Sequence, residues 1–317
     1  MYTYRQILKQ AFKIAWKKPG LWIFGFFLAL MGTAGEFEVF LGSVGTGRGG
    51  FLTPFIEGVV SGGLFSVTGF QGFASNLVAN PFLLLVAIFF LLLAFGTSIL
   101  GIWLLMVSQG ALIGQVIAAS KAKDLRFHEG FALGISKFWS VLGVNVIFRL
   151  VAWLLLGLSI AASFMVFPGS VFIFIAISGV LLIISAVVSF IIRYALCGIV
   201  LRDFNIKKSL ATAWVLFKEN WVLSFEISLL LFFIYLLTNA FLFFFLGLVL
   251  LTALDFFSGF AFGLLLILVV LFIIFVVAEI ILAVFYWATW ALVFEIIASR
   301  KALLKSFVKT TFDKLFS

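Results

Sequence analysis

Long, uninterrupted apolar runs alternate along this chain with short segments in which apolar and basic residues recur at helical spacing. The apolar runs cover residues 19–35, 81–119, 141–167, 171–201, 221–254 and 260–298. A helix needs about 20 apolar residues to cross the roughly 30 Å hydrocarbon core of a bilayer. The pattern therefore predicts an all-α, polytopic membrane helix bundle with six transmembrane helices.

The runs at 81–119 and 260–298 are much longer than a bilayer requires, since a helix rises about 1.5 Å per residue. Each is either one helix that projects beyond the membrane or a broken helix. We expect projection at the cytoplasmic end, because polar residues gather there. These residues are Ser108, Gln109, Gln115, Ser120, Glu295 and Ser299.

The short segments share one amphipathic pattern. Within 4–16, apolar residues recur on one helical face and basic residues lie opposite. The same spacing returns at 127–139, 206–218 and 304–316. The first three copies each precede an odd-numbered run, which predicts a threefold repeat of one interfacial amphipathic helix plus two spans. Within a single membrane domain, 1–317, the predicted units are 1–120, 121–202 and 203–298, closed by an amphipathic helix at 299–317.

Composition supports this class. The chain is 65% hydrophobic and 10% charged, with a mean hydropathy of +1.33, whereas soluble domains are nearer half apolar and a quarter charged. A single cysteine, Cys197, and a single histidine, His128, exclude an intramolecular disulfide and a zinc site built on a histidine pair.

Enzyme motifs are also missing from the sequence, which contains no His-Glu-x-x-His, Walker or Gly-x-Ser-Gly motif. We therefore expect no catalytic, cofactor-binding or metal-binding residues. The net charge of +9 is too thinly spread for a nucleic-acid surface, so we expect no nucleic-acid partner.

The basic residues predict the orientation in the membrane. All but three of the 21 Lys and Arg residues lie in the segment before the first run, after the second, after the fourth and after the sixth. The exceptions are Arg48, in the insert at 35–80, and Arg149 and Arg193, inside runs. Cytoplasmic loops carry the excess of Lys and Arg, so both termini are predicted to be cytoplasmic.

The amphipathic segments predict contact with lipid. A helix with aromatic residues on one face and basic residues on the other lies at the membrane surface, where anionic headgroups attract it. These segments either anchor the spans or form a collar that recruits particular lipids or proteins. The expected contacts with anionic phospholipid headgroups are Arg5, Lys9, Lys13, Lys17, Lys207, Lys208, Lys305 and Lys309.

Four charged residues inside the runs are candidates for a polar site. Charge within a membrane is costly and marks a functional site by default. Arg149, Arg193 and Glu226 lie toward the cytoplasmic ends of their runs, and Glu279 lies in the middle of the sixth. They either pair and reach toward headgroups or line a cavity for an ion, a lipid headgroup or another substrate.

The insert between the first two runs, residues 35–80, is predicted to be extracytoplasmic. It begins with a flexible, glycine-rich stretch. Residues 51–77 are apolar, with many Gly and Ser residues, and either lie on the outer surface or re-enter the bundle.

The residues at 4–12 (YRQILKQAF), 16–19 (WKKP), 108–113 (SQGALI) and 207–210 (KKSL) resemble the glycerophosphoryl diester phosphodiesterase membrane domain. The resemblance extends over nearly the whole chain and implies a prokaryotic plasma-membrane protein with cytoplasmic amphipathic helices. The catalytic barrel of such phosphodiesterases needs about 200 further residues, so the resemblance carries over no catalytic residue.

Together these features predict a non-enzymatic scaffold or accessory factor in envelope or lipid homeostasis, with a membrane protein as a possible partner. The alternative is a transporter or lipid translocator that uses the buried charges at repeat interfaces.

Overall fold

The computed structural model describes residues 4–31, 80–123, 125–165, 171–256 and 261–299. These residues are helical almost throughout, and none of them forms a strand. The helices are α1 (Tyr4–Lys17), α2 (Gly20–Met31), α6 (Pro81–Ser120), α7 (Phe127–Met165), α8 (Val171–Arg202), α9 (Ile206–Glu219), α10 (Trp221–Phe256) and α11 (Ala261–Ala298).

Five helices are long and apolar enough to cross a membrane, namely α6, α7, α8, α10 and α11. The described part of the first run, α2, has 12 residues, which amounts to about 18 Å. The structure therefore shows a multi-span helical protein. The two longest runs form the single unbroken helices α6 and α11, so the alternative of a broken helix is wrong for both.

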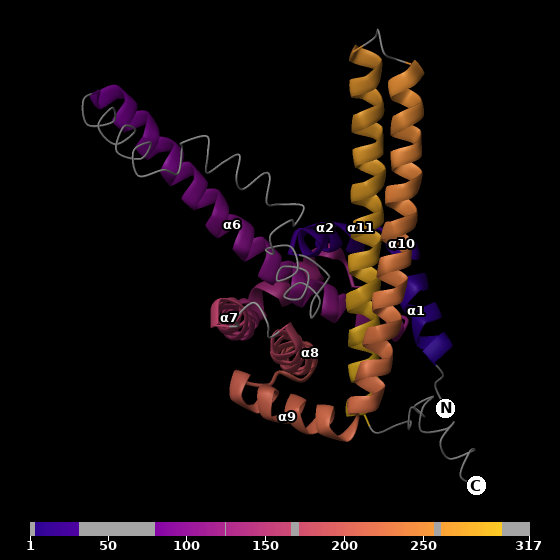
Figure 1. The fold of residues 1–317 in the computed structure, drawn as a ribbon. Helices are drawn as coiled ribbons and strands as arrows, with labels where there is room; N and C mark the ends of the chain where they lie inside the picture. The colour runs from indigo at the N-terminus through magenta and orange to yellow at the C-terminus, as the bar shows by residue number, and fades with distance from the viewer. Residues whose placement is uncertain (1–3, 32–79, 124, 166–170, 257–260, 300–317) are drawn as a thin grey trace. The chain divides into compact units, whose positions relative to one another are not determined.

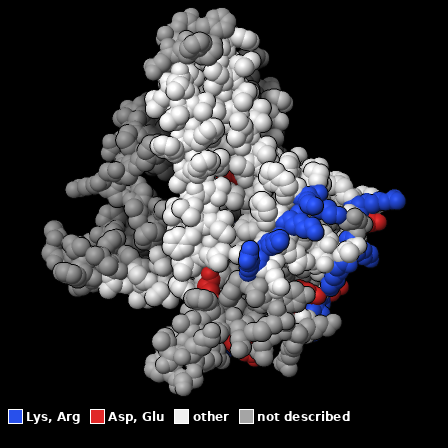
Figure 2. Space-filling model, turned by 90° about the vertical axis from the view of Figure 1, so that its right-hand side faces the viewer, with Lys and Arg blue, Asp and Glu red and all other residues white. Residues whose placement is uncertain are grey.

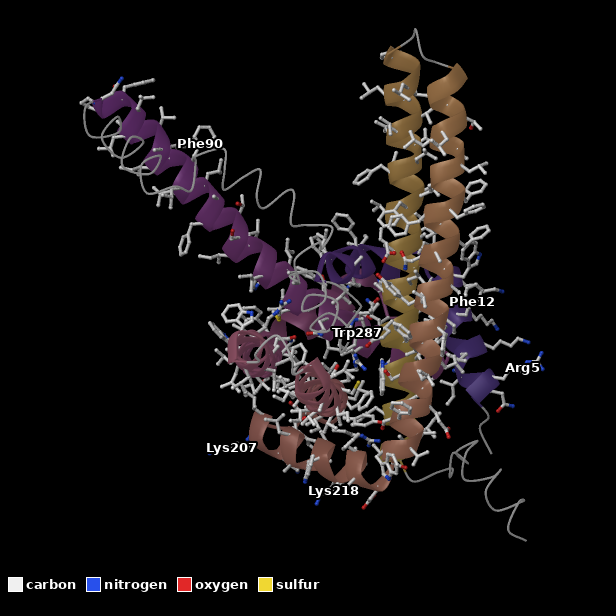
Figure 3. The ribbon with its side chains drawn as sticks, viewed as in Figure 1. Arg5, Phe12, Phe90, Lys207, Lys218 and Trp287 are labelled. Atoms are coloured by element: carbon white, nitrogen blue, oxygen red, sulfur yellow. The ribbon has the colours of Figure 1, made fainter. Side chains whose placement is uncertain are left out.

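The helices form two compact units, which are described separately. The first unit comprises Met1–Ala34, Leu105–Phe148 and Val188–Ser317. The second comprises Gly35–Leu104 and Arg149–Val187, and its part of α6 carries large exposed apolar side chains such as Phe90 (Figure 3).

The core of the first unit lies at the C-terminal ends of three helices. Burial is concentrated at 106–117 of α6, 190–200 of α8 and 283–294 of α11. Trp290 of α11 is fully buried and lies against the rings of Phe190 and Tyr194 of α8. In contrast, Phe272 and Ile273, nearer the start of α11, are exposed. The packed part of the unit is therefore the end that carries the polar residues.

Small residues allow the helices of this core to approach closely. A side-chain carbon added at Gly110 of α6 would lie 3.3 Å from the Cα atom of Gly134 of α7. One added at Gly25 of α2 would lie 2.5 Å from a methyl group of Val284 on α11. Such contacts are typical of membrane helices, where small residues let backbones meet.

Hydrogen bonds link polar side chains of this core on different helices. Asn145 Nδ2 of α7 donates a 2.7 Å hydrogen bond to Gln109 Oε1 of α6. The hydroxyl groups of Tyr194 on α8 and Ser224 on α10 lie 2.7 Å apart. Because a buried polar group is costly when unpaired, these bonds help to fix how the helices pack.

Candidate functional site

α1 carries the first basic amphipathic segment, and its apolar side is divided into a buried and an exposed strip. The buried residues are Ile7, Ala11, Ile14 and Ala15. Phe12 and Trp16, predicted on the same apolar face, are 54% and 58% exposed, and their rings stack at 6.1 Å. They share the exposed strip with Arg5 and Lys9. The side of α1 that is buried is thus formed by small and branched side chains, while the two aromatic rings stay largely exposed.

The course of α1 follows a membrane span. Leu8 and Thr289 of α11 border the same small cavity. One turn further along both helices, the ring of Phe12 meets that of Phe285 edge to face at 6.4 Å. Figure 1 shows α1 beside the lower part of α11. α1 therefore runs along α11 in the opposite direction.

α9 carries the third copy of the pattern and docks in another way. Its buried residues are Ser209 and Ala213. Ser209 Oγ donates a 2.5 Å hydrogen bond to the carbonyl of Ala195 on α8, and a side-chain carbon added at Gly198 would lie 2.8 Å from the same hydroxyl. This close approach holds α9 across the end of α8 (Figure 1).

The exposed side of α9 combines lysines with aromatic rings. Lys207 and Lys218 lie at opposite ends of the helix (Figure 3). Lys218 Nζ lies 5.2 Å from the ring centroid of Trp214, and Lys208 Nζ lies 4.5 Å from that of Phe204. All three lysines are exposed. The combination suits a membrane surface, where aromatic rings sit at headgroup level beside basic residues.

The second copy is not a separate amphipathic helix, which corrects the prediction for 127–139. These residues form the first turns of α7, which continues without a break into the third span. Gly130 and Gly134 are buried, while Trp139 is 78% exposed. The helix continues because no helix-breaking residue separates the two parts, and its glycines let it pack directly on α6.

Two predicted regions lie outside the described residues. They are the fourth copy, with Lys305 and Lys309, and nearly all of the insert at 35–80. The remaining predicted lipid contacts, on α1 and α9, are all exposed. Figure 2 shows blue side chains gathered beside the lower half of the white α10–α11 hairpin.

Arg193 is the most deeply buried of the four intramembrane charges, at 4% exposure. Its guanidinium carbon lies 4.8 Å from the ring centroid of Trp290, 5.0 Å from that of Tyr286 and 5.8 Å from that of Phe190. A cation over aromatic faces is stabilised more strongly when it is shielded from water. The structure therefore surrounds Arg193 with rings, a setting that the sequence pattern did not predict.

The other predicted intramembrane charges have different surroundings. Arg149 belongs to the second unit and is exposed, whereas Glu226 is half-buried on α10 in the first. Glu279 is half-buried near the middle of α11 and is hydrogen-bonded by the side chains of Asn239 and Tyr235 on α10. Its Oε1 atom is buried without a hydrogen-bond partner among the described residues. Glu279 thus has hydrogen-bond partners on the neighbouring helix α10.

Glu295 is a residue whose role the sequence did not reveal. Its Oε1 atom lies 2.8 Å from Lys121 Nζ, and its Oε2 atom lies 3.5 Å from Arg202 Nη2. Lys121 follows α6 and Arg202 ends α8, so one carboxylate on α11 joins the ends of three helices. The sequence contains an acidic residue near the end of one predicted helix and basic residues at the ends of two others. The fold is needed to show that these three ends meet.

Among the residues that the structure describes, no group of three His, Cys, Asp or Glu residues could hold a metal ion. Comparisons with protein-family models, curated proteins and solved structures give no match to this chain. The arrangement of residues in the molecule therefore carries the functional argument.

Proposed function

We propose that this protein is a non-enzymatic integral membrane protein that binds the anionic leaflet of its membrane. It would act as a scaffold or accessory factor in envelope or lipid homeostasis. The observation that carries this proposal is the arrangement of α1 and α9. Each buries a narrow strip against a span and leaves lysines or arginines and aromatic rings exposed on the same side. Helices of this kind bind anionic membrane surfaces.

The proposal includes location and topology. We place the chain in the plasma membrane of a prokaryote, with six spans and both termini in the cytoplasm. Support comes from the resemblance to the phosphodiesterase membrane domain and from the gathering of basic residues at the packed end of the first unit. Here α2 would belong to the first span.

We also retain the threefold repeat as a proposal. Equivalent positions of the first three copies, Ala11, Gly134 and Ala213, all hold small buried residues. The ends of α6, α8 and α11 each contain a buried Ala-Leu pair. These pairs are Ala111-Leu112, Ala195-Leu196 and Ala291-Leu292. Both observations fit a duplicated unit.

Lipid selectivity tests the proposed binding. The full chain is reconstituted in phosphatidylcholine with spin-labelled phosphatidylglycerol or phosphatidylcholine, and the motionally restricted fraction is measured. We expect preference for phosphatidylglycerol, and we expect the preference to weaken with salt because exposed charges are screened. Changing Lys13, Lys17, Lys207 and Lys208 together to Gln should reduce it, whereas changing them to Arg should preserve it. Equal restriction of both lipids by the unaltered protein would overturn the proposal.

A scaffold also requires a protein partner. Cross-linking in native membranes, followed by purification, should recover a membrane protein with the unaltered chain and lose it with the four-Gln variant. If the four-Gln variant still retains that protein, the basic residues of α1 and α9 do not bind the partner.

One observation favours a second function, transport. Glu279 is a half-buried carboxylate at mid-span with a buried, unpaired oxygen among the described residues, and transporter sites lie near the bilayer midplane. Proteoliposomes would be assayed for movement of labelled lipid and of protons. If the protein is a transporter, the flux should change in the Glu279→Gln variant. The flux of the exposed control variant, Glu219→Gln, should equal that of the unaltered chain. Absence of flux above that of empty vesicles would reject this second function.

A further inference from the structure

A groove of about 780 Å³ lies between α1 and the α10–α11 hairpin. α1 contributes one wall with Arg5, Lys9, Phe12 and Trp16, and the hairpin contributes an almost entirely apolar wall. The volume is within the range of sites that hold small molecules, about 300–1,000 Å³. All of its residues belong to the first unit.

One end of the groove is cationic. Arg5 and Lys9 are one helical turn apart on α1, and both are exposed. Within the described part of the chain, neither has an ion-pair partner, and none of the residues lining the groove is acidic. Figure 3 shows Arg5 near the free end of α1, with Phe12 further along the same helix. The positive charge at the basic end is therefore not neutralised by any acidic residue in the described part of the chain.

The groove continues from this end along the span. On α10 its lining extends from Leu230 to Thr238, a rise of about 12 Å. On α11 it extends from Phe285 back to Ala278, toward the middle of the helix. Because α1 runs opposite to α11, the basic end lies toward the packed end of the helices, and the apolar part lies toward the middle of α11. The groove thus combines a cationic end with apolar walls, which is the polarity of one phospholipid molecule.

We infer that this groove binds one anionic phospholipid from the surrounding bilayer, with an acyl chain between α1 and the hairpin and its phosphate at Arg5 and Lys9. The inference rests on the proposed function and adds a discrete site to a general preference for anionic lipid. Charge decides the occupant. The chain's own segment at 300–317 is rich in lysine and would be repelled, and a zwitterionic headgroup would leave the two cations without a net counter-charge.

Native mass spectrometry of the full chain in about 150 mM ammonium acetate tests the site, because at this ionic strength charges beyond roughly 8 Å are screened. Phosphatidylglycerol and phosphatidylcholine with identical acyl chains would be titrated, and the Kd of the first bound lipid would be measured. Arg5→Gln/Lys9→Gln removes the basic end of the groove. Lys13→Gln/Lys17→Gln removes equal charge from the same helix outside the groove and is the matched control.

We expect phosphatidylglycerol to bind the unaltered chain first, and we expect the Arg5→Gln/Lys9→Gln variant to bind it about 30-fold more weakly. The Lys13/Lys17 control should weaken it less, because neither lysine lines the groove and Lys17 lies about two helical turns beyond Lys9. Equal weakening in both double variants would overturn the proposed lipid site in the groove but would still agree with general binding to the anionic leaflet. No preference for phosphatidylglycerol in the unaltered chain would overturn the groove and the proposed function together.

A second pair of variants tests the apolar part without changing charge. Ala278→Phe should fill the groove and weaken the first phosphatidylglycerol by about tenfold or more, as expected when a bulky group blocks a well-packed site. Ile274→Phe, on the same helix outside the groove, should leave Kd unchanged. Unaltered binding to a folded Ala278→Phe variant would overturn the inference, as would a protein dimer in place of the lipid adduct.

Discussion

α1 and α9 carry the same amphipathic pattern and dock in different directions. Positions 202 residues apart are buried in both, as Ala11 and Ala213 illustrate. Yet α1 runs along α11, whereas α9 lies across the end of α8 (Figure 1). A shared pattern thus determines which side of a helix is buried, and the partner helix determines the direction.

The contact residues explain the difference. At equivalent positions α1 has Ile7 and α9 has Ser209. Ile7 belongs to an apolar strip that follows α11, while Ser209 forms a hydrogen bond to one carbonyl beside Gly198. Of these two helices, α1 is therefore the one that lies along the apolar α10–α11 hairpin and forms a groove with it.

The second copy offers the largest test of the shared buried strip. Gly134→Ala should lower the free energy of unfolding by about 3 kcal/mol, because the added carbon would overlap the carbonyl oxygen of Val107. Gly96→Ala, in open space on α6, should have no cost and should gain about 0.5 kcal/mol. Both values come from denaturant titration in mixed micelles. Equal stability of the two variants would contradict the packing described for α6 and α7.

A smaller effect tests whether α1 and α9 bury the same strip. Ala11→Leu and Ala213→Leu should each lower the free energy of unfolding by about 2 kcal/mol, since both sites are closely packed. The exposed Ala211→Leu on α9 should change it by less than about 0.5 kcal/mol. If the free energy of unfolding falls at only one of the two buried sites, the two copies are not equivalent.

Much of the fold could be predicted from the sequence. The runs at 81–119 and 260–298 become α6 and α11 nearly residue for residue. The continuity of α7 was not predicted, although no proline lies between its amphipathic turns and the span, whereas Pro19 follows α1. The directions in which α1 and α9 pack cannot be predicted from the sequence either, since they depend on contacts such as the hydrogen bond between Ser209 and Ala195.

The candidate site was predicted in part. Exposure of Arg5, Lys9 and Lys207 follows from helical periodicity. The rings around Arg193 and the pairing of Glu295 with Lys121 and Arg202 depend on the meeting of distant helices. Helical periodicity carries no information about such contacts between distant helices.

A hydrogen bond that only α9 forms provides a third test. Ser209→Ala should lower the free energy of unfolding by about 1 kcal/mol, because the carbonyl of Ala195 loses its side-chain donor. Ser136→Ala is the control, since that exposed hydroxyl donates only within its own helix, to Leu133. If the two variants are equally stable, the hydroxyl does not anchor α9.

The smallest expected change in stability concerns the residues that end α6 and α8, just before the amphipathic segments at 127–139 and 206–218. Ala122 after α6 and Asp203 after α8 both have a φ of 57°, a conformation that favours glycine. Ala122→Gly should raise the free energy of unfolding by about 0.5 kcal/mol. Asp203→Gly should gain less, because it also breaks the ion pair with Lys137. A larger gain at Asp203 would mean that this ion pair contributes nothing.

The most direct test of the account is the depth of α1 and α9 in a bilayer. Spin labels at positions 5 and 16 of α1, and at the equivalent positions 207 and 218 of α9, replace exposed residues in a Cys197→Ala background. Relaxation by oxygen and by a water-soluble nickel chelate gives the depth of each label. We predict the same headgroup depth for 207 and 218, and a difference approaching about 16 Å between 5 and 16. Four labels as accessible to the chelate as those on a soluble protein would contradict the claim that these helices bind the membrane.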